Sequence, residues 1–235
     1  MICKLLAHTD DCEKLVAGAA RLCYSAQSID NLFDNLTEHE KFIERLIKMG
    51  HESPLEHCSF TFGIEGVSRS LMAQITRHRI ASHSVKSQRY VNESGMSYIT
   101  PPSIESVPEA AAIFKDTMEY LREQYVKLRN ILYERLLADG EKPSDAEKLA
   151  IENARFVLPN ACETKMIVTM NARSLHNFFR LRCCGRAQWE IRDLANCMLE
   201  LVRGVAPNIF KFAGPPCANG VCPEGAMSCG KVWDK

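Results

Sequence analysis

The sequence predicts an α+β fold. We expect a single domain over residues 1–235, with a small, mainly antiparallel sheet flanked by helices, one of them long. Apolar residues repeat at helical spacing in more segments than they alternate at strand spacing. The helical segments do not alternate regularly with strands, as they do in parallel βαβ sheets. The 235 residues, 46% of them hydrophobic, are enough to bury a substantial core.

The first quarter of the chain predicts a strand followed by two helices. Residues 1–8 alternate weakly between polar and apolar side chains and predict the strand. A helix over residues 10–24 follows, with Thr9 or Asp10 as its cap. The capping-box pattern TEHE begins at Thr37 and predicts the second helix, which ends near residue 50.

The next segments predict a strand, a helix and a long connection. Residues 58–67 alternate at strand spacing. Residues 68–78 predict a helix in which Leu71 and Ile75 lie one turn apart. Residues 80–97 show neither period strongly, so we expect loop and extended chain there.

The rest of the chain is mostly helical. A long helix over 108–137 keeps its apolar residues in helical period, and a further helix covers 144–154. After a short strand over 165–170, Asn171 is a good N-cap for a helix that runs through Arg182. A last helix covers 187–204. Residues 213–235 are rich in Pro, Gly and Cys and predict an irregular tail.

Composition excludes several classes of protein. The formal net charge is zero, which argues against a general polyanion binder. No apolar run approaches the roughly 20 residues of a membrane helix, and the apolar stretch at the start is too short for a signal peptide. We therefore expect a cytoplasmic protein without a membrane partner. No GxG pattern occurs, so the Rossmann fingerprint is missing.

The chain has 11 cysteines, an odd number, and no CxxC pair. Without a secretory signal they are expected to be reduced thiols. A cysteine-bound metal stays open as an alternative, although the spacing matches no standard site. The cysteines that could form one are Cys183, Cys184, Cys217, Cys222 and Cys229.

Charge is unevenly distributed along the chain. Residues 66–92 and 164–189 contain no Asp or Glu, whereas an even scatter of the 29 acids would place about six or seven in these two windows. Each window contains five basic residues. Two local positive surfaces in a neutral protein favour a small, multiply charged ligand over a long nucleic acid.

The first window contains the strongest local pattern. Gln74, Arg77 and His78 would share one helix face at spacings of three and four residues. Arg79 leaves the helix, and Ser87 and Arg89 follow on an extended segment with their side chains aligned. Guanidinium groups bind phosphate oxygens in a bidentate manner, and a serine hydroxyl adds a donor. A solvated basic helix end would give the same composition, but not the loss of acids around it.

The second window places polar donors at a helix start. Asn171 as cap, with Arg173 and Asn177 four residues apart, would present amide and guanidinium donors near a positive helix N-terminus. Arg182 lies at the far end of the same helix. A capped helix with a solvated basic face is the alternative interpretation. His51 and Glu56, on either side of Pro54, form a polar turn that taken alone indicates nothing more.

Three separated segments resemble the flavin-dependent thymidylate synthases. RHRIASHSVKSQRY resembles their RHR-x7-S signature. HESPLEHCSFTF is similar to their H-E-(T/S)-P-x-E-H segment, and NARSLHNFFRLRCCGRAQWEI to their N-A-R-S-L-x-N-F segment and its continuation to A-Q-W-E-I. ARFVLP resembles the segment that bears a nucleotide-binding arginine. The first three occur in the family's order between residues 51 and 191.

The resemblance implies ligands and an assembly. It implies FAD as hydride carrier, NADPH as reductant, methylenetetrahydrofolate as carbon donor and dUMP as the nucleotide that is methylated to dTMP. It also implies a homotetramer whose active sites are shared between subunits. It implies neither a metal nor a nucleic-acid partner. The missing dinucleotide motif leaves the choice between NADPH and NADH open.

Site residues follow from the motif positions. Flavin contacts are expected from Ser53, Arg77, His78, Arg79, Val85, Asn171, Arg173 and Asn177. Nucleotide contacts are expected from Gln74, Arg77, Ser87, Arg89, Arg155 and Arg182, and His51 matches a histidine near flavin and folate. Val85 stands where many members carry Glu or Gln, so only its backbone amide is left to contact a ligand.

Arg182 is the residue expected to be catalytic. Arginine stays protonated, so it cannot act as a base. It can bind a uracil carbonyl and stabilise the charge that develops during methylation. The implied reaction needs no protein nucleophile, and no cysteine is assigned a catalytic role. A nucleic-acid-binding module that uses the two basic surfaces is the alternative function, and a salt-dependent binding titration distinguishes the two.

Overall fold

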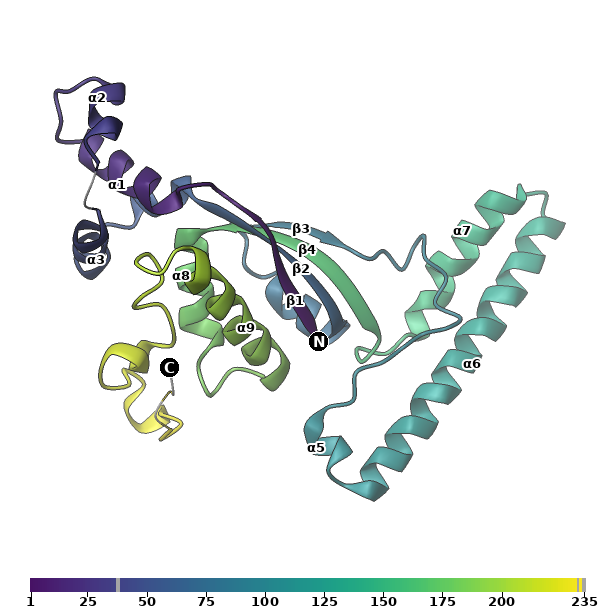
Figure 1. The fold of residues 1–235 in the computed structure, drawn as a ribbon. Helices are drawn as coiled ribbons and strands as arrows, with labels where there is room; N and C mark the ends of the chain where they lie inside the picture. Colours follow the sequence, from purple (N-terminus) through teal and green to yellow (C-terminus); the bar gives the residue numbers. More distant parts are fainter. Residues whose placement is uncertain (37–38, 232, 234–235) are drawn as a thin grey trace. The chain divides into compact units, whose positions relative to one another are not determined.

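A computed structural model describes residues 1–36, 39–231 and 233, and its fold is α+β as predicted. Figure 1 shows the four-stranded antiparallel sheet, whose order is β1-β2-β4-β3. The strands are β1 (Ile2–His8), β2 (Ser59–Ser68), β3 (Ser82–Val85) and β4 (Glu163–Asn171). The helices are α1 (Cys12–Leu22), α2 (Ile29–Asp34), α3 (Glu40–Lys48), α4 (Arg69–Ile75), α5 (Pro102–Glu105), α6 (Pro108–Ala138), α7 (Pro143–Ala154), α8 (Ala172–Arg182) and α9 (Trp189–Val205).

Short 3-10 turns complete the described elements. They are η1 (Ser53–His57), η2 (Arg155–Val157), η3 (Pro216–Asn219) and η4 (Gly225–Met227). The chain divides into two compact units. The first unit comprises residues 1–64, 74–84 and 167–235, and the second comprises 65–73 and 85–166. No helix in the described part of the chain has both the length and the apolar character needed to cross a bilayer. The single-domain expectation for the whole chain stays a prediction.

The core of the first unit forms where helices α8 and α9 meet the sheet. Phe60, Phe62 and Ile64 of β2 alternate with more exposed neighbours and are fully buried, as the strand period requires. Helix α9 packs on β1, and α8 packs on α9. Phe210, after α9, meets Phe60 edge to face with ring centroids 5.3 Å apart. This packing fixes α8, which carries much of the NARSLHNFFRLR segment.

The first unit also contains a small group of helices that follows β1. Helix α1 packs against α2, α3 and η1. Gly18 lets the Phe33 ring of α2 approach closely, because a Cβ at residue 18 would lie only 2.4 Å from the ring. Gly50 adopts a left-handed φ of 73° just after α3, which explains why that helix ends where the sequence predicted.

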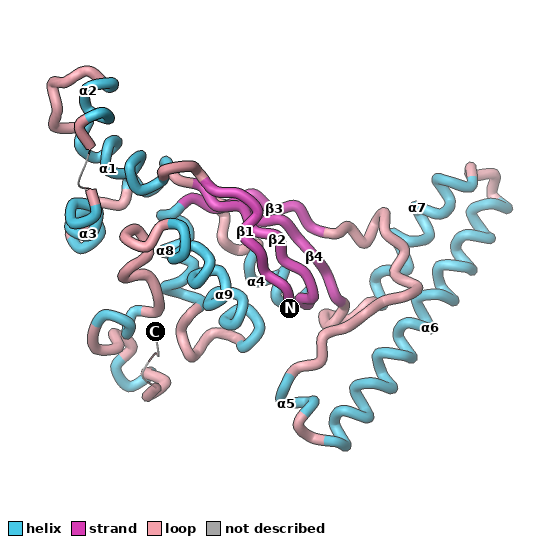
Figure 2. The backbone as a smooth tube through the Cα atoms, viewed as in Figure 1, coloured by secondary structure: helices cyan, strands magenta, loops and turns pink. Residues whose placement is uncertain are grey.

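The second unit is built around the long helix α6. Its bounds, Pro108–Ala138, and those of α7, Pro143–Ala154, match the predicted helices closely. Figure 2 shows α6 and α7 side by side, joined by a short turn, and the two helices are in contact. Tyr125 of α6 is completely buried, whereas Ile113, Tyr120 and Ile131 of the same helix are exposed.

Some element predictions were wrong. The expected cap of α1, Thr9 or Asp10, is instead Asp11, which adopts a left-handed φ of 45° and accepts no capping hydrogen bond. Helix α2 was not predicted; Ser28 caps it by accepting the Asn31 N–H. Thr37 and Glu38, the first half of the expected capping box, lie outside the described residues.

The local geometry around the RHR pattern also differs from the prediction. Helix α4 ends at Ile75, so Gln74, Arg77 and His78 do not share a helix face. The backbone N–H groups of Arg77 and His78 donate to carbonyls only three residues back, in tight turns. Ser87 and Arg89 do not lie on an extended segment either. Strand β3 ends at Val85, and the Val91 N–H donates to the Ser87 carbonyl to close a turn.

Candidate active site

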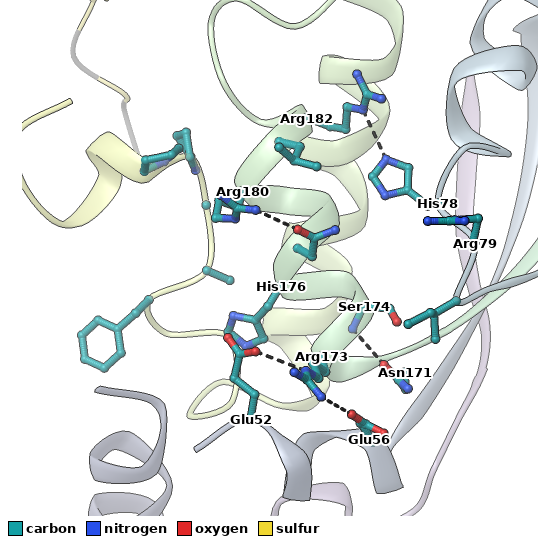
Figure 3. A pocket seen from close by; sticks show the side chains of 18 of the residues that line it. Glu52, Glu56, His78, Arg79, Asn171, Arg173, Ser174, His176, Arg180 and Arg182 are labelled. Carbon is teal, nitrogen blue, oxygen red and sulfur yellow. Dashed lines mark hydrogen bonds and ion pairs between the residues drawn. The ribbon is translucent and has the colours of Figure 1, made fainter. Parts of the chain in front are cut away.

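A cavity of about 1070 Å³ opens in the first unit, beside helix α8. Figure 3 shows the side chains that line it. They come from four places in the sequence: η1 with the residue before it, the turn after α4, helix α8 with its cap, and the segment that follows α9. The lining residues are Glu52, Glu56, Arg77, His78, Arg79, Ile80, Asn171, Arg173, Ser174, His176, Asn177, Arg180, Leu181, Arg182, Phe212, Ala213, Gly214, Pro215 and Pro216.

The cavity is positively charged. Five arginines and only two glutamates line it. The first turn of α8 also faces it, and a helix N-terminus adds a partial positive charge and free N–H donors. A cavity of this size and sign suits a large anionic ligand with phosphate groups.

Asn171 caps α8 as the sequence predicted. Its Oδ1 accepts a hydrogen bond from the Ser174 N–H at 2.8 Å, which satisfies one of the unpaired donors of the first turn. The cap orients the asparagine so that its side chain lines the cavity. Oδ1 accepts this bond from the helix, and the Nδ2 amide remains available to donate to a ligand.

Arg173, also in the first turn of α8, is held by two carboxylates. Its Nε donates to Glu52 Oε2 at 3.2 Å, and its Nη1 donates to Glu56 Oε1. Both pairs are drawn as dashed lines in Figure 3. Glu56 and then Glu52 raise the pKa of Arg173, which keeps the guanidinium charged. These two ion pairs join α8 to η1. All three side chains remain open to solvent, so the pairs add little to the stability of the fold.

His78 and Arg182 meet at the other end of α8. Arg182 Nε donates to His78 Nε2 at 3.3 Å. Burial, the charge of Arg182 and that of His83 lower the pKa of His78 to about 4. Burial and the charge of Arg77 also lower the pKa of Arg182, although not enough to deprotonate an arginine. His78 is therefore a neutral acceptor at neutral pH, held edge to face against Phe178 with ring centroids 4.9 Å apart.

His176 forms part of the cavity wall and was missed by sequence reasoning. Its Nε2 donates to the Ile209 carbonyl at 3.0 Å, and its ring stacks on Phe210 at 5.2 Å. Burial lowers its pKa, so it also remains neutral. It occupies position i+3 from Arg173 on α8, and that spacing was the available signal.

Other lining residues were also missed. Ser174, Glu52 and Arg180 line the cavity, and Arg180 Nη2 donates to Asn177 Oδ1 at 3.0 Å. The spacing along α8 could have indicated Ser174 and Arg180. Ser174 lies three residues after Asn171, and Arg180 lies seven residues after Arg173, so each is at helical spacing from an expected flavin contact. Residues 212–216 could not be found in this way, because only the tertiary fold brings them to α8.

The structure brings together six of the predicted flavin contacts and Arg182. Arg77, His78, Arg79, Asn171, Arg173 and Asn177 all line the one cavity. Ser53, His51 and Gln74 belong to the same unit but are not among its lining residues. Ser53 begins η1, next to Glu52, and the His51 N–H donates to the Leu46 carbonyl at 3.0 Å. Gln74 lies in the last turn of α4.

The remaining predicted residues belong to the second unit. Val85 ends β3. Arg89 Nη2 pairs with Glu152 Oε2 of α7 at 2.9 Å, and Arg155 Nε donates to the Glu152 carbonyl at 3.1 Å. Glu152 raises the pKa of Arg89. Two of the expected nucleotide-binding arginines thus meet around Glu152.

Ser87 belongs to the same segment as Arg89. The Ser87 hydroxyl accepts the Arg89 N–H at 3.2 Å and so fixes the local turn. No base is hydrogen-bonded to this hydroxyl in the described residues, which suits a binding role better than a nucleophilic one. The three predicted nucleotide contacts of the second unit therefore lie on a turn and on the end of α7.

The cysteines give no metal centre. All 11 are free thiols, and the described residues contain no group of three or more His, Cys, Asp and Glu side chains placed to hold a metal. Cys183, next to Arg182, is buried, and burial raises the pKa of its thiol to about 12. A thiol with that pKa is a poor nucleophile at neutral pH.

Comparison with known proteins identifies the class. Residues 4–208 match the family described as thymidylate synthase complementing protein. A flavin-dependent thymidylate synthase of Clostridium tetani (strain Massachusetts / E88) is 56% identical over 97% of this chain and 93% of its own length. The enzyme of the same name from Geobacter sulfurreducens is 50% identical over 97% of this chain and 93% of its length. That from Nitratidesulfovibrio vulgaris is 46% identical over 97% and 94%.

This chain belongs to the flavin-dependent thymidylate synthase family. It is a methyltransferase of dUMP that depends on a flavin. The resemblance carried by the three motifs is thereby confirmed. The comparisons give no support to the alternative function, a nucleic-acid-binding module.

Proposed function

We propose that the cavity beside α8 binds FAD, and that the chain uses NADPH and methylenetetrahydrofolate to convert dUMP to dTMP. One observation carries the proposal: residues of all three sequence motifs line one positive cavity of about 1070 Å³. Glu52 and Glu56 belong to the HESPLEHCSFTF segment, and Arg77 to Arg79 begin the RHRIASHSVKSQRY segment. Asn171 to Arg182 belong to the NARSLHNFFRLRCCGRAQWEI segment. A pyrophosphate-bearing cofactor matches such a cavity in both size and charge.

The residues in the cavity suit the parts of FAD. Arg77, Arg79 and Arg173 supply charged donors for the two phosphates, and the N-terminus of α8 adds to the positive potential. Asn171 and Asn177 supply amide groups at the same helix, and neutral His78 offers an uncharged edge. Ser53 and the Val85 amide remain flavin contacts in this proposal on the strength of the resemblance alone.

Six residues are proposed to contact the nucleotide: Gln74, Arg77, Ser87, Arg89, Arg155 and Arg182. Guanidinium forks and a hydroxyl suit the phosphate of dUMP. His51 is proposed to lie near the folate. The ion pair of Arg89 with Glu152 holds this guanidinium in place before it meets a substrate.

The chemistry requires little of the protein beyond binding and electrostatics. When FAD is bound, it would supply the hydride-transfer chemistry between NADPH and the nucleotide, and the chain's own residues would bind and orient these groups. Arg182 would hold a uracil carbonyl and stabilise negative charge on it, because its guanidinium stays protonated. His78 orients Arg182 by accepting its Nε–H. No cysteine is given a role in catalysis.

Assembly and location complete the proposal. We propose that the 235 residues act as one domain within a homotetramer whose active sites are shared. Exposed apolar side chains on α6, together with Phe156 at 82% exposure, support burial by another copy of the chain. Sedimentation velocity would give the mass of the assembly. The cytoplasmic location stays a prediction from the sequence.

The test is an anaerobic absorption experiment. The purified protein is recorded in the visible range before and after NADPH, with and without dUMP. We expect a flavin band that bleaches with NADPH and bleaches faster when dUMP is present. A protein that shows no flavin band, and acquires none after FAD is added, would contradict the cofactor assignment. Replacing NADPH with NADH in the same cuvette compares the two reductants.

A further inference from the structure

A buried ion pair closes the base of the turn that carries Ser87 and Arg89. Lys86 Nζ lies 2.9 Å from Glu93 Oε1 and 3.1 Å from Oε2. The Glu93 side chain is only 5% exposed and that of Lys86 21%, so both charges are largely removed from water. The two residues are seven positions apart, with the turn residues Ser87 and Arg89 between them. All of these residues belong to the second unit.

Each end of this turn is also tied to the core of the second unit. The Lys86 N–H donates to the Lys165 carbonyl at 3.0 Å, and Arg69 Nη1 donates to the Lys86 carbonyl at 3.2 Å. At the other end, the Glu93 N–H donates to the Tyr125 hydroxyl oxygen at 3.1 Å. Tyr125 is fully buried in α6. The base of the turn is therefore held by β4, α4 and α6.

The outer part of the turn is much more exposed. Gln88 points inward: it is 8% exposed, and its Nε2 lies 3.4 Å from Cys162 Sγ. Tyr90, two residues later, is 64% exposed. The Val91 N–H donates to the Ser87 carbonyl at 3.1 Å. The two ends of the turn are thus polar and buried, whereas its outer part is accessible to solvent. Arg89, in the outer part, pairs with Glu152.

The role of this ion pair is better explained by the positioning of the turn than by a gain in folding stability. Moving two charges out of water costs free energy that their attraction only partly repays, so apolar residues of similar volume often do as well. In some proteins, buried polar or ionic groups instead fix one arrangement among several. Here the pair fixes the distance between the two ends of a turn that presents a guanidinium and a hydroxyl. The Lys86 ammonium contacts both carboxylate oxygens of Glu93.

We infer that Lys86 and Glu93 are positioning residues for nucleotide binding, because their ion pair holds Ser87 and Arg89 in the arrangement that receives the phosphate of dUMP. This inference rests on the proposed function, which assigns Ser87 and Arg89 to the nucleotide. Neither Lys86 nor Glu93 contacts the substrate in this proposal. Their effect is carried by the geometry of the turn.

The first test is Glu93→Gln in the full-length, flavin-loaded enzyme. Glutamine has nearly the same shape but leaves the Lys86 ammonium without its counter-charge. We expect the Kd and KM for dUMP to rise about tenfold, since a loosened turn must be ordered again on binding. We expect kcat at saturating dUMP to stay within about twofold, and the flavin content to equal that of the wild type.

A second variant avoids leaving a buried charge. Tyr125→Phe removes the hydroxyl that accepts the Glu93 N–H and preserves the ring. It should raise the Kd for dUMP about threefold, in the same direction as Glu93→Gln. It carries the test if Glu93→Gln fails to fold. Unchanged dUMP binding in the folded variants would overturn the inference.

A double-mutant cycle separates positioning from a general loss of structure. If the pair acts through Arg89, Arg89→Ala will cost less affinity for dUMP in the Glu93→Gln background than in the wild type. Fully additive effects would overturn this route. Exchanging the charges, Lys86→Glu with Glu93→Lys, should recover part of the affinity. The matched control is Glu123→Gln, which breaks an exposed pair with Lys127 in the same unit and should leave dUMP binding unchanged.

Measurements on the wild-type enzyme distinguish failure of the proposed function from failure of the positioning inference. If it neither binds dUMP nor forms dTMP, the proposed function is wrong, and the positioning inference falls with it. If it binds dUMP normally and Glu93→Gln and Tyr125→Phe bind equally well, only the inference is wrong. Isothermal titration of dUMP into each flavin-loaded protein provides these comparisons.

Discussion

Arg182 donates its Nε–H to Nε2 of His78 across 3.3 Å. Two cationic groups would repel each other at this distance, so the contact exists only with a neutral imidazole. Because Nε2 accepts, the ring proton of His78 must sit on Nδ1. The pair joins the end of α8 to the turn after α4 and sets the direction of the guanidinium that is proposed to bind uracil.

The pH dependence of His78 follows from this contact. Burial, Arg182 and His83 lower its pKa to about 4, against about 6.5 in the unfolded chain. Between these values the unfolded chain binds a proton here that the folded chain does not. Stability should therefore fall as pH falls from 6.5 to 4, and this contribution should be constant above 6.5. Titration of the ring C–H resonances by NMR measures the folded pKa.

The same titration in Arg182→Ala tests the cause. Removing the guanidinium should raise the pKa of His78 toward its usual value without reaching it, because burial is the larger cause and remains. His78→Gln assigns the resonance. A wild-type His78 that titrates near 6.5 would show that it is not held as a neutral acceptor.

Arg182→Ala should also separate flavin binding from methyl transfer. We expect dTMP formation to fall at least about a hundredfold, the usual cost of removing a group that stabilises charge in a transition state. Flavin content should be retained, because the other four arginines of the cavity remain. Arg135→Ala removes an arginine of α6 that pairs with the C-cap residue Asp139, and it is the matched control. Turnover like that of the wild type in Arg182→Ala would remove its catalytic assignment.

Much of the fold could be predicted because local patterns agree with the tertiary structure. The long apolar period of α6 and the Asn171 cap of α8 are both local signals, and both were right. The end of α4 was missed because no Gly or Pro marks it: residues 76–79 could continue a helix. The tight turns there are stabilised by contacts such as that of His78 with Arg182, which a sequence does not display.

The candidate site shows the same division. Motif positions identified most of the arginines and asparagines that line the cavity. Glu52, which pairs with Arg173 across more than a hundred residues of sequence, was not identified. The wall formed by residues 212–216 was missed for the same reason, because its position depends on where the chain returns after α9. Interactions between distant segments carry no periodic signal.

Asn171 has an observed capping role and a proposed flavin-binding role, and substitution can separate the two. Asn171→Ala removes the cap of α8 and should cost about 1 kcal/mol of unfolding free energy. Asn171→Ser keeps a side-chain oxygen at the cap and should cost much less. If the amide also donates to the flavin, both variants will raise the Kd for FAD, by about five- to tenfold. Thermal unfolding and flavin titration are the two measurements. A serine variant that binds FAD like the wild type would leave Asn171 with the capping role alone.

Glu13 should stabilise the folded chain and also support the cavity wall. Its carboxylate accepts three hydrogen bonds, from the Asn208 N–H and Nδ2 at 2.7 Å each and from the Ile209 N–H at 3.2 Å. Glu13→Ala leaves these donors without their acceptor and should cost about 2–3 kcal/mol. Ile209 in turn accepts from His176 of the cavity, so flavin affinity should fall as well.

Chemical denaturation followed by circular dichroism measures the stability effect of Glu13→Ala. Glu13→Gln keeps one acceptor oxygen for a backbone N–H but loses the charge, so its cost should be intermediate. Asp116→Ala, at an exposed acid of α6, is the matched control and should change stability by less than about 0.5 kcal/mol. If Glu13→Ala unfolds at the same denaturant concentration as this control, then the segment after α9 is held by its buried side chains, Ile209 and Phe210, and the carboxylate is not needed to order it.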